Sequence, residues 1–172
     1  MRELRDLVKI TKSHDYREFK EFIRSEYDMA NVHEDEEMVF FNDVPKHWQK
    51  AYLKVTWPMP RTERLLMNIA SQDVLEYSYQ KWGFLPGNVV LTFYNAPLQR
   101  ALMVLKCLKE HPGAEAELAM VRRNNVNLLK AWLEKYHTLA EDSERYLEEH
   151  PEAQSLKSEY VNYTLMRQTE QL

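Results

Sequence analysis

Glycine is the residue type that most constrains this chain, because only three glycines occur in 172 residues. Average usage of about 7% would place roughly twelve glycines in a chain of this length. Tight β-hairpin turns, phosphate-binding loops and dinucleotide-binding motifs all depend on glycine. Its scarcity therefore argues against β-rich and nucleotide-binding folds and favours a mainly α-helical protein.

Composition and charge place the chain among globular proteins. Hydrophobic residues make up 44% and charged residues 29% of the sequence, and the net charge is −4, which gives no general attraction to nucleic acid or anionic membranes. The single cysteine, Cys107, excludes an internal disulfide and suits a reducing compartment. The N-terminal residues lack an apolar segment, and the apolar run at Val89–Leu91 is far too short to span a bilayer. We therefore expect a cytoplasmic protein that makes no membrane contact.

Residues 113–150 show the longest helical pattern in the chain. Apolar residues recur there every three or four positions, and no glycine or proline lies between Gly113 and Pro151. Read as one helix, this stretch would be about 55 Å long. The residues that form the apolar face are Leu118, Val121, Leu128, Leu129, Trp132, Tyr136, Leu139, Tyr146 and Leu147.

The helices next to this stretch predict an antiparallel arrangement. An apolar stripe follows Pro97 and ends at Glu110, and the short connection His111-Pro112-Gly113 favours an antiparallel return. A last helix is expected over Glu152–Gln171. The fold class predicted is mainly α, with six to eight helices and a long antiparallel C-terminal helical hairpin.

The N-terminal half predicts further short helices and at most two short β-strands. Helices are expected over Arg2–Lys12, from Tyr16 onward after the capping residue Asp15, and over Lys46–Val55. The apolar runs Val39–Phe41 and Val89–Phe93 are the strand candidates.

Prolines at positions 58 and 60 force an extended connection in the middle of the chain. We place a boundary there between an N-terminal helical subdomain, residues 1–57, and a C-terminal helical subdomain, residues 58–172. A single continuous domain is the alternative.

One internal similarity occurs at a spacing of 39 residues. The residues around His111-Pro112 match those around His150-Pro151, and each proline resembles the helix-end proline of tetratricopeptide repeats. Only two copies exist, and the small residues that the family places at helix contacts are missing. We interpret the match as one helix-ending signal used twice, with a helical repeat as the alternative.

The sequence carries no local motif for catalysis, a metal or a cofactor. Zinc-protease, phosphate-binding, dinucleotide-binding and serine-hydrolase motifs are all missing. We therefore predict no cofactor and no metal, and we favour a protein that is not an enzyme. An enzyme with an active site built from scattered residues is the second alternative.

Five residues of the long helical pattern are the candidates for binding a protein partner. Asn125 falls on the apolar stripe, and a polar residue in a helical seam fixes register and partner number. It either bonds to a neighbouring helix of its own chain or marks a surface where another chain docks. Trp132 and Tyr136 belong to residue types favoured at interface hot spots, although they serve as core residues at least as often. The candidates are Arg122, Arg123, Asn125, Trp132 and Tyr136.

A second group of residues suggests nucleic-acid binding as the first alternative. Cationic and aromatic side chains alternate between positions 46 and 64, and aromatic rings can stack on bases while Lys and Arg contact phosphates. The competing interpretation is a helix that buries its aromatic residues and leaves its charges in water. The residues are Lys46, Trp48, Lys50, Trp57, Arg61 and Arg64.

The function predicted from sequence is thus that of a non-enzymatic adaptor, regulator or loader. It binds another protein, of unknown identity, through its C-terminal helices. Self-association is left open.

Overall fold

A computed structural model describes residues 3–170, and within them the chain forms thirteen α-helices, one short 3₁₀ helix and no β-strand. The prediction of a mainly α-helical fold is confirmed. The number of helices is larger than the six to eight predicted, because the chain turns after nearly every three helical turns. The helices are α1 (Leu7–Ser13), α2 (Tyr16–Ile23), α3 (Glu26–Ala30), α4 (Glu34–Asp43), α5 (Lys46–Val55), α6 (Pro60–Ile69), α7 (Gln72–Trp82), α8 (Pro86–Asn95), α9 (Leu98–Cys107), α10 (Ala114–Arg122), α11 (Val126–Tyr136), α12 (Glu141–Glu149) and α13 (Gln154–Glu170), with the 3₁₀ helix at Pro151–Ala153.

The chain repeats one helical hairpin. The first helices of five successive hairpins, α4, α6, α8, α10 and α12, begin at Glu34, Pro60, Pro86, Ala114 and Glu141, so the hairpins start 26 to 28 residues apart. Proline supports this pattern because its fixed φ suits the first position of a helix, which Pro60 and Pro86 occupy. The repeat is therefore real, but its period is not the 39 residues seen between the two His-Pro pairs.

Contacts divide the chain into two units, and the division falls between Phe84 and Leu85 in the sequence. The connection that contains Trp57 and Pro58 joins α5 to α6 inside the first unit. The predicted division at that connection stays a prediction.

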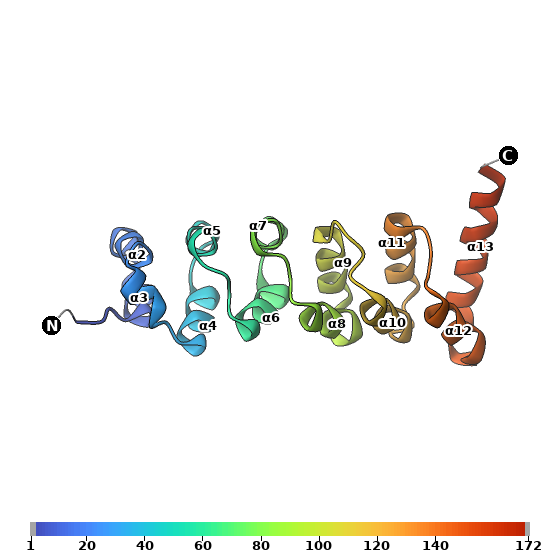
Figure 1. Ribbon diagram of the computed structural model, residues 1–172, viewed down its shortest axis with the longest axis horizontal. Coiled ribbons are helices and arrows are strands. Elements are labelled where there is room, and N and C mark those ends of the chain that lie inside the picture. The colour runs from blue at the N-terminus through green and yellow to red at the C-terminus, as the bar shows by residue number, and fades with distance from the viewer. Residues whose placement is uncertain (1–2, 171–172) are drawn as a thin grey trace. The chain divides into compact units, whose positions relative to one another are not determined.

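Each unit is built in two layers of helices (Figure 1). In the first unit α4 packs against both α1 and α6, while α5 packs against α2 and α7. In the second unit α10 packs between α8 and α12, and α11 packs between α9 and α13. First helices therefore contact first helices and second helices contact second helices, which is how stacked repeats bury a continuous core.

Aromatic side chains form the centre of the first unit. Trp48 of α5 stacks on Phe19 of α2, with ring centroids 4.8 Å apart, and Phe19 in turn stacks on Phe40 of α4 at 5.1 Å. Tyr52 packs against Phe40 at 5.0 Å. Phe40 and the adjacent Phe41 are almost fully buried. The apolar run at positions 39–41 thus lies in α4 and is not a strand.

The second strand prediction is also wrong, because residues 89–93 lie in α8. Val89 and Phe93, one helical turn apart, face the interior, and Phe93 meets Trp132 of α11 with ring centroids 5.8 Å apart. A short apolar β-branched run cannot be assigned to strand or helix by periodicity alone. Tertiary packing decides in favour of the helix, because α8 packs against both α9 and α10.

The long helix predicted over Gly113–His150 is three helices, α10, α11 and α12, so the long C-terminal hairpin is not formed. Asn124 and His137 end α10 and α11 with φ values of 56° and 69°. This left-handed conformation stops a helix, and asparagine adopts it more readily than most residues. No glycine or proline is needed for either break.

Several local predictions are confirmed by the structure. Helix α5 spans Lys46–Val55, as its apolar spacing indicates. Asp15 caps α2 by accepting the backbone N–H groups of Arg17 and Glu18. The last helix lies within the predicted range, whose final residue Gln171 falls outside the described residues, as does Arg2 at the start of the first predicted helix.

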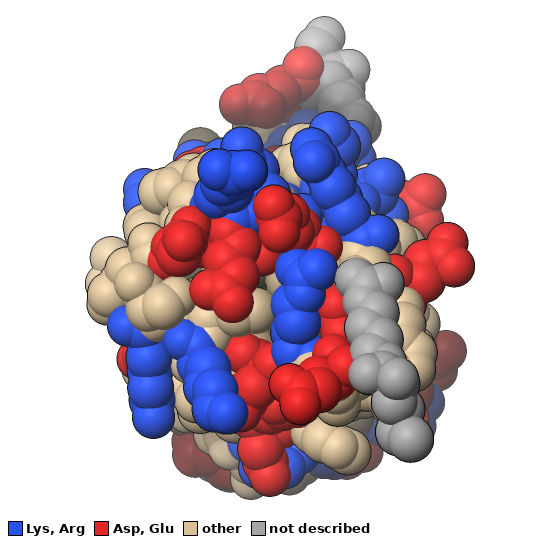
Figure 2. All heavy atoms as spheres, turned by 90° about the vertical axis from the view of Figure 1, so that its left-hand side faces the viewer, with Lys and Arg blue, Asp and Glu red and all other residues tan. Residues whose placement is uncertain are grey.

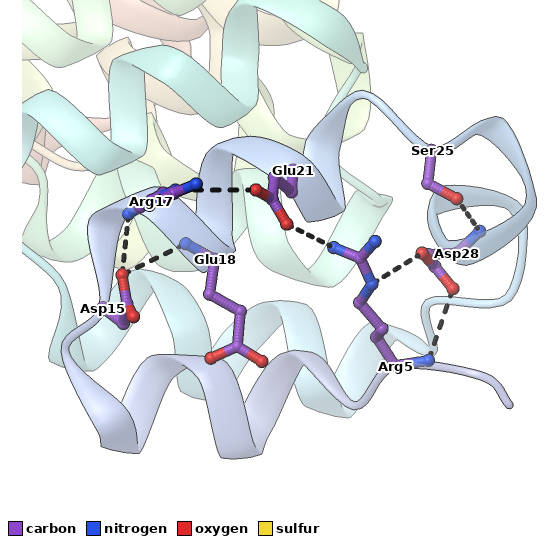
Figure 3. Close-up of polar contacts among 7 residues, drawn as sticks. All are labelled: Arg5, Asp15, Arg17, Glu18, Glu21, Ser25 and Asp28. Atoms are coloured by element: carbon purple, nitrogen blue, oxygen red, sulfur yellow. Dashed lines mark hydrogen bonds and ion pairs between the residues drawn. The ribbon is translucent and has the colours of Figure 1, made fainter.

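The N-terminal side of the first unit is covered by charged groups of both signs (Figure 2). Arg5 lies 3.6 Å from the buried carboxylate of Asp28 and 3.8 Å from Glu21, which also contacts Arg17 (Figure 3). The hydroxyl of Ser25 accepts the backbone N–H of Asp28 at 3.2 Å. This side of the first unit therefore carries a network of paired charges.

Candidate protein-binding surfaces

Two buried glutamates, Glu37 and Glu117, accept backbone N–H groups at the hairpin junctions and serve the fold. Glu37, 1% exposed, accepts the backbone N–H of Met59 at 2.7 Å and the hydroxyl of Tyr52 at 2.9 Å. Burial raises the pKa of Glu37 above its usual value, and burial together with the nearby Glu37 carboxylate raises the pKa of the Tyr52 hydroxyl. The carboxylate is thus held by a backbone group at the start of the next hairpin.

Glu117 repeats this arrangement in the second unit. Its carboxylate accepts the backbone N–H of Ala140 at 2.7 Å, and its other oxygen lies 2.9 Å from Nε2 of His111. The N–H of Gly113 donates to His111 Nδ1 at 3.1 Å, so the imidazole proton on Nε2 points at Glu117. We interpret Glu37 and Glu117 as links between repeats.

Three of the predicted partner-binding residues lie together where α10 meets α11. Arg122 is exposed, and its guanidinium lies 5.9 Å from the ring of Tyr146, which stacks on His150 at 3.9 Å. Arg123 approaches two backbone carbonyls at the end of α8, each at 3.5 Å. Asn125 is half-buried and caps α11, accepting the N–H of Leu128 at 3.0 Å. Its oxygen therefore bonds its own helix, so Asn125 is not a residue of a helical seam.

The other two predicted residues lie elsewhere. Trp132 has no exposed surface, and its ring packs against those of Phe93, His111 and Tyr136. Tyr136 is half-buried, and its hydroxyl donates to the carbonyl of Glu110 at 2.9 Å. Trp132 is thus a core residue, and the five candidates do not form one surface.

The cations of the predicted nucleic-acid segment are largely paired with carboxylates. Lys50 lies 2.9 Å and Lys46 3.5 Å from Asp73. The hydrogen bond from Ser71, together with the two lysines, lowers the pKa of that carboxyl. Arg61 lies 3.2 Å from Asp35 and 3.7 Å from Glu34. These pairs reduce the positive charge that phosphate groups would meet.

The remaining residues of that segment have different surroundings. Trp48 is buried in the aromatic core, whereas Trp57 is 49% exposed and Arg64 is exposed. The segment therefore does not present alternating rings and cations on one surface. Nucleic-acid binding stays an untested prediction.

A groove of about 450 Å³ lies between α12 and α13 at the C-terminal side of the second unit. Leu147 and Val161 form its apolar part. Two of its carboxylates are paired with cations, because Arg145 lies 3.0 Å from Glu141 and Lys157 contacts Glu148. The third, Glu144, accepts the hydroxyl of Tyr160. The groove thus offers apolar contact area inside a charged rim that is acidic overall.

Helix α13 carries apolar side chains outside this groove as well. Three of its apolar side chains are exposed: Val161 at 44%, Leu165 at 55% and Met166 at 64%. Another side of the helix is held against the second unit by the buried Leu156 and by Tyr163, whose hydroxyl donates to the carbonyl of Leu133. The sequence analysis predicted this helix but did not identify Val161 and Leu165 as exposed apolar residues. Their spacing of four residues, offset from Leu156 and Tyr163, was the available signal.

The described residues contain no group of three or more His, Cys, Asp or Glu side chains arranged to hold a metal ion. Among the same residues, no helix is both long enough and apolar enough to cross a membrane. Comparisons with protein-family models, with curated proteins and with solved structures found no match to this chain.

Proposed function

We propose that this protein is a non-enzymatic binding protein that contacts another protein through α12 and α13. The observation that carries the proposal is the exposure of Val161, which lines the groove between α12 and α13, and of Leu165 one helical turn further along α13. Helix α13 packs on its own domain with one side only and carries apolar residues on another side. Such a helix can bind the apolar face of a partner helix.

The row formed by Arg122, Tyr146 and His150 supports the same proposal. The three side chains are already stacked on one another, so binding would cost little side-chain entropy there. Arginine and tyrosine are also enriched at interface hot spots. A protein that binds a partner in this way would act as an adaptor, regulator or loader.

Affinity capture with the immobilised full-length protein tests the proposal. We expect Val161→Glu with Leu165→Glu to lower the amount of a captured protein about tenfold or more, because both changes place charge in the docking area. The matched control is Tyr94→Glu, which changes a side chain that is 58% exposed on α8. Equal capture by wild type and the double variant would contradict the proposal, and sedimentation analysis would show whether the captured chain is a second copy.

A further inference from the structure

The first unit carries an apolar surface of its own along the ends of α2, α5 and α7. A groove of about 340 Å³ lies between α2, α3 and the end of α5, and its apolar residues are Ile23, Met29, Ala30 and Val55. Val55 is 46% exposed. The groove lies within the first unit, far in sequence from the surface on α12 and α13.

Two half-exposed tryptophans extend this groove. Trp57, 49% exposed, follows Val55 by two residues in the connection to α6. Trp82 at the end of α7 is 38% exposed, and its indole N–H donates to the carbonyl of Leu53 at 2.7 Å. That bond places Trp82 against the end of α5, the helix whose last residue, Val55, lines the groove. The groove, Trp57 and Trp82 are here together called the tryptophan edge.

Three cations without a carboxylate partner among the described residues lie in or next to the tryptophan edge. Arg24 and Lys54 are exposed, and neither has a carboxylate partner among the described residues. Lys81 lies 5.5 Å from the ring of Trp82 and likewise has no carboxylate partner in that part of the chain. Glu26 is the one carboxylate that lines the groove. The edge thus combines apolar area with three such cations, whereas Glu34 and Asp35, the carboxylates at the start of α4, are paired with Arg61.

We propose that the tryptophan edge binds an acidic amphipathic segment of another protein. Its apolar side chains would fill the groove beside Val55 and cover Trp57, and its carboxylates would lie against Lys54 and Lys81. Tryptophan is the residue type most enriched at hot spots, and complementary charge gives such contacts specificity.

A single-stranded nucleic acid fits these residues less well. Base stacking needs open ring faces, but Lys81 lies over the ring of Trp82. The groove next to the indoles is lined by aliphatic side chains, which a phosphate backbone would not contact favourably. Nucleic-acid binding is therefore an outcome that the experiment must separate from peptide binding.

Tryptophan fluorescence of the full chain tests the proposal. Two of the four tryptophans, Trp48 and Trp132, are buried, so quenching by iodide reports mainly on Trp57 and Trp82. The probe is a tryptophan-free peptide of about 18 residues, roughly five helical turns, with leucine on one face and glutamate on the other. A peptide with lysine in place of every glutamate and a single-stranded oligonucleotide are the comparison probes.

We expect the glutamate peptide to bind and to protect Trp57 and Trp82 from iodide, with an affinity that falls as salt is added. Lys54→Glu with Lys81→Glu, and separately Trp57→Ala, should each weaken binding about tenfold or more. The control Lys12→Glu with Lys106→Glu makes the same change of net charge at exposed positions away from the edge and should bind as wild type does.

Three results would overturn the proposal. They are an absence of protection by the glutamate peptide, binding of the lysine peptide as tightly as the glutamate peptide, and oligonucleotide binding that the Lys54 and Lys81 changes abolish. The Val161 and Leu165 double variant should bind the glutamate peptide as wild type does. Failure of either proposed surface can therefore be recognised separately.

Discussion

The carboxylate of Glu37 in α4 accepts the backbone N–H of Met59, 22 residues further along the chain, at 2.7 Å. Met59 is the residue that precedes α6, and its own side chain makes no capping hydrogen bond to that helix. Glu117 does the same for Ala140, which precedes α12. A glutamate at the fourth position of one first helix thus anchors the start of the next first helix.

Removal of the Glu37 carboxylate should destabilise the first unit. Glu37→Ala leaves the N–H of Met59 and the hydroxyl of Tyr52 without their acceptor, which we expect to cost about 1–3 kcal/mol. Glu37→Gln keeps an acceptor oxygen and should cost less. Urea unfolding followed by fluorescence measures both, with Glu134→Ala, an exposed position on α11, as the control. A cost no larger than that of the control would show that the link is not needed.

The same residue should make stability depend on pH. Burial raises the pKa of Glu37 in the folded protein above the ordinary value of 4.5. Between pH 4.5 and the raised pKa the unfolded chain has lost this proton while the folded chain retains it, so the free energy of unfolding falls as pH rises through that window. Below pH 4.5 the folded and unfolded chains both carry this proton, so the stability that Glu37 contributes is fully present there.

The comparison of wild type with Glu37→Gln isolates this effect, because the other titrating groups are common to both. We expect the unfolding free energy of the wild type to fall relative to that of Glu37→Gln as pH rises from the acid range toward neutrality. Urea unfolding at a series of pH values measures the difference. A shift in the opposite direction would mean that the pKa of Glu37 is lowered in the folded protein.

Trp132→Ala should destabilise the second unit by about 3–5 kcal/mol, because the side chain has no exposed surface and its removal leaves a large cavity. Trp132→Phe should cost less, since it keeps most of the packing and removes an indole N–H that has no hydrogen-bond partner among the described residues. Thermal unfolding measures both changes. Tyr94→Ala, at an exposed position, should stay within about 0.5 kcal/mol of wild type.

Asn125→Ala should destabilise α11 by about 0.5–2 kcal/mol, the usual cost of losing an N-cap. Asn125→Asp and Asn125→Ser should restore most of that loss, since both side chains can accept the N–H of Leu128. Circular dichroism during urea unfolding gives the comparison. If all three variants were equally unstable, the role of Asn125 would lie in another contact.

The repeat could have been recognised from particular residues of the sequence. Pro60 and Pro86 stand 26 residues apart at the starts of equivalent helices, and Glu37 and Glu63, equally buried, occupy the fourth position of successive first helices. The two His-Pro pairs instead suggest a spacing of 39 residues, which is not the period of the hairpins. His111-Pro112 precedes α10, whereas His150-Pro151 lies inside the connection between α12 and α13, so the two pairs occupy different places in the hairpin.

The candidate surfaces were less accessible to sequence reasoning. Trp132 and Trp57 are both candidates for binding in the sequence, yet one has no exposed surface and the other is 49% exposed. The pairing of Lys50 and Lys46 with Asp73 joins α5 to α7. No spacing rule within one helix predicts burial or ion pairing that a neighbouring helix produces.

The sequence by itself determined that the protein is helical and where α5 begins and ends. Both depend on short-range physics, namely the scarcity of glycine and the apolar spacing within one helix. Only the tertiary structure decided that residues 114–149 form three helices and that Glu37 is buried. The left-handed turns at Asn124 and His137 are stable because they let α10, α11 and α12 each pack in a layer. A buried carboxylate is tolerated because the backbone of the next hairpin brings an N–H to it.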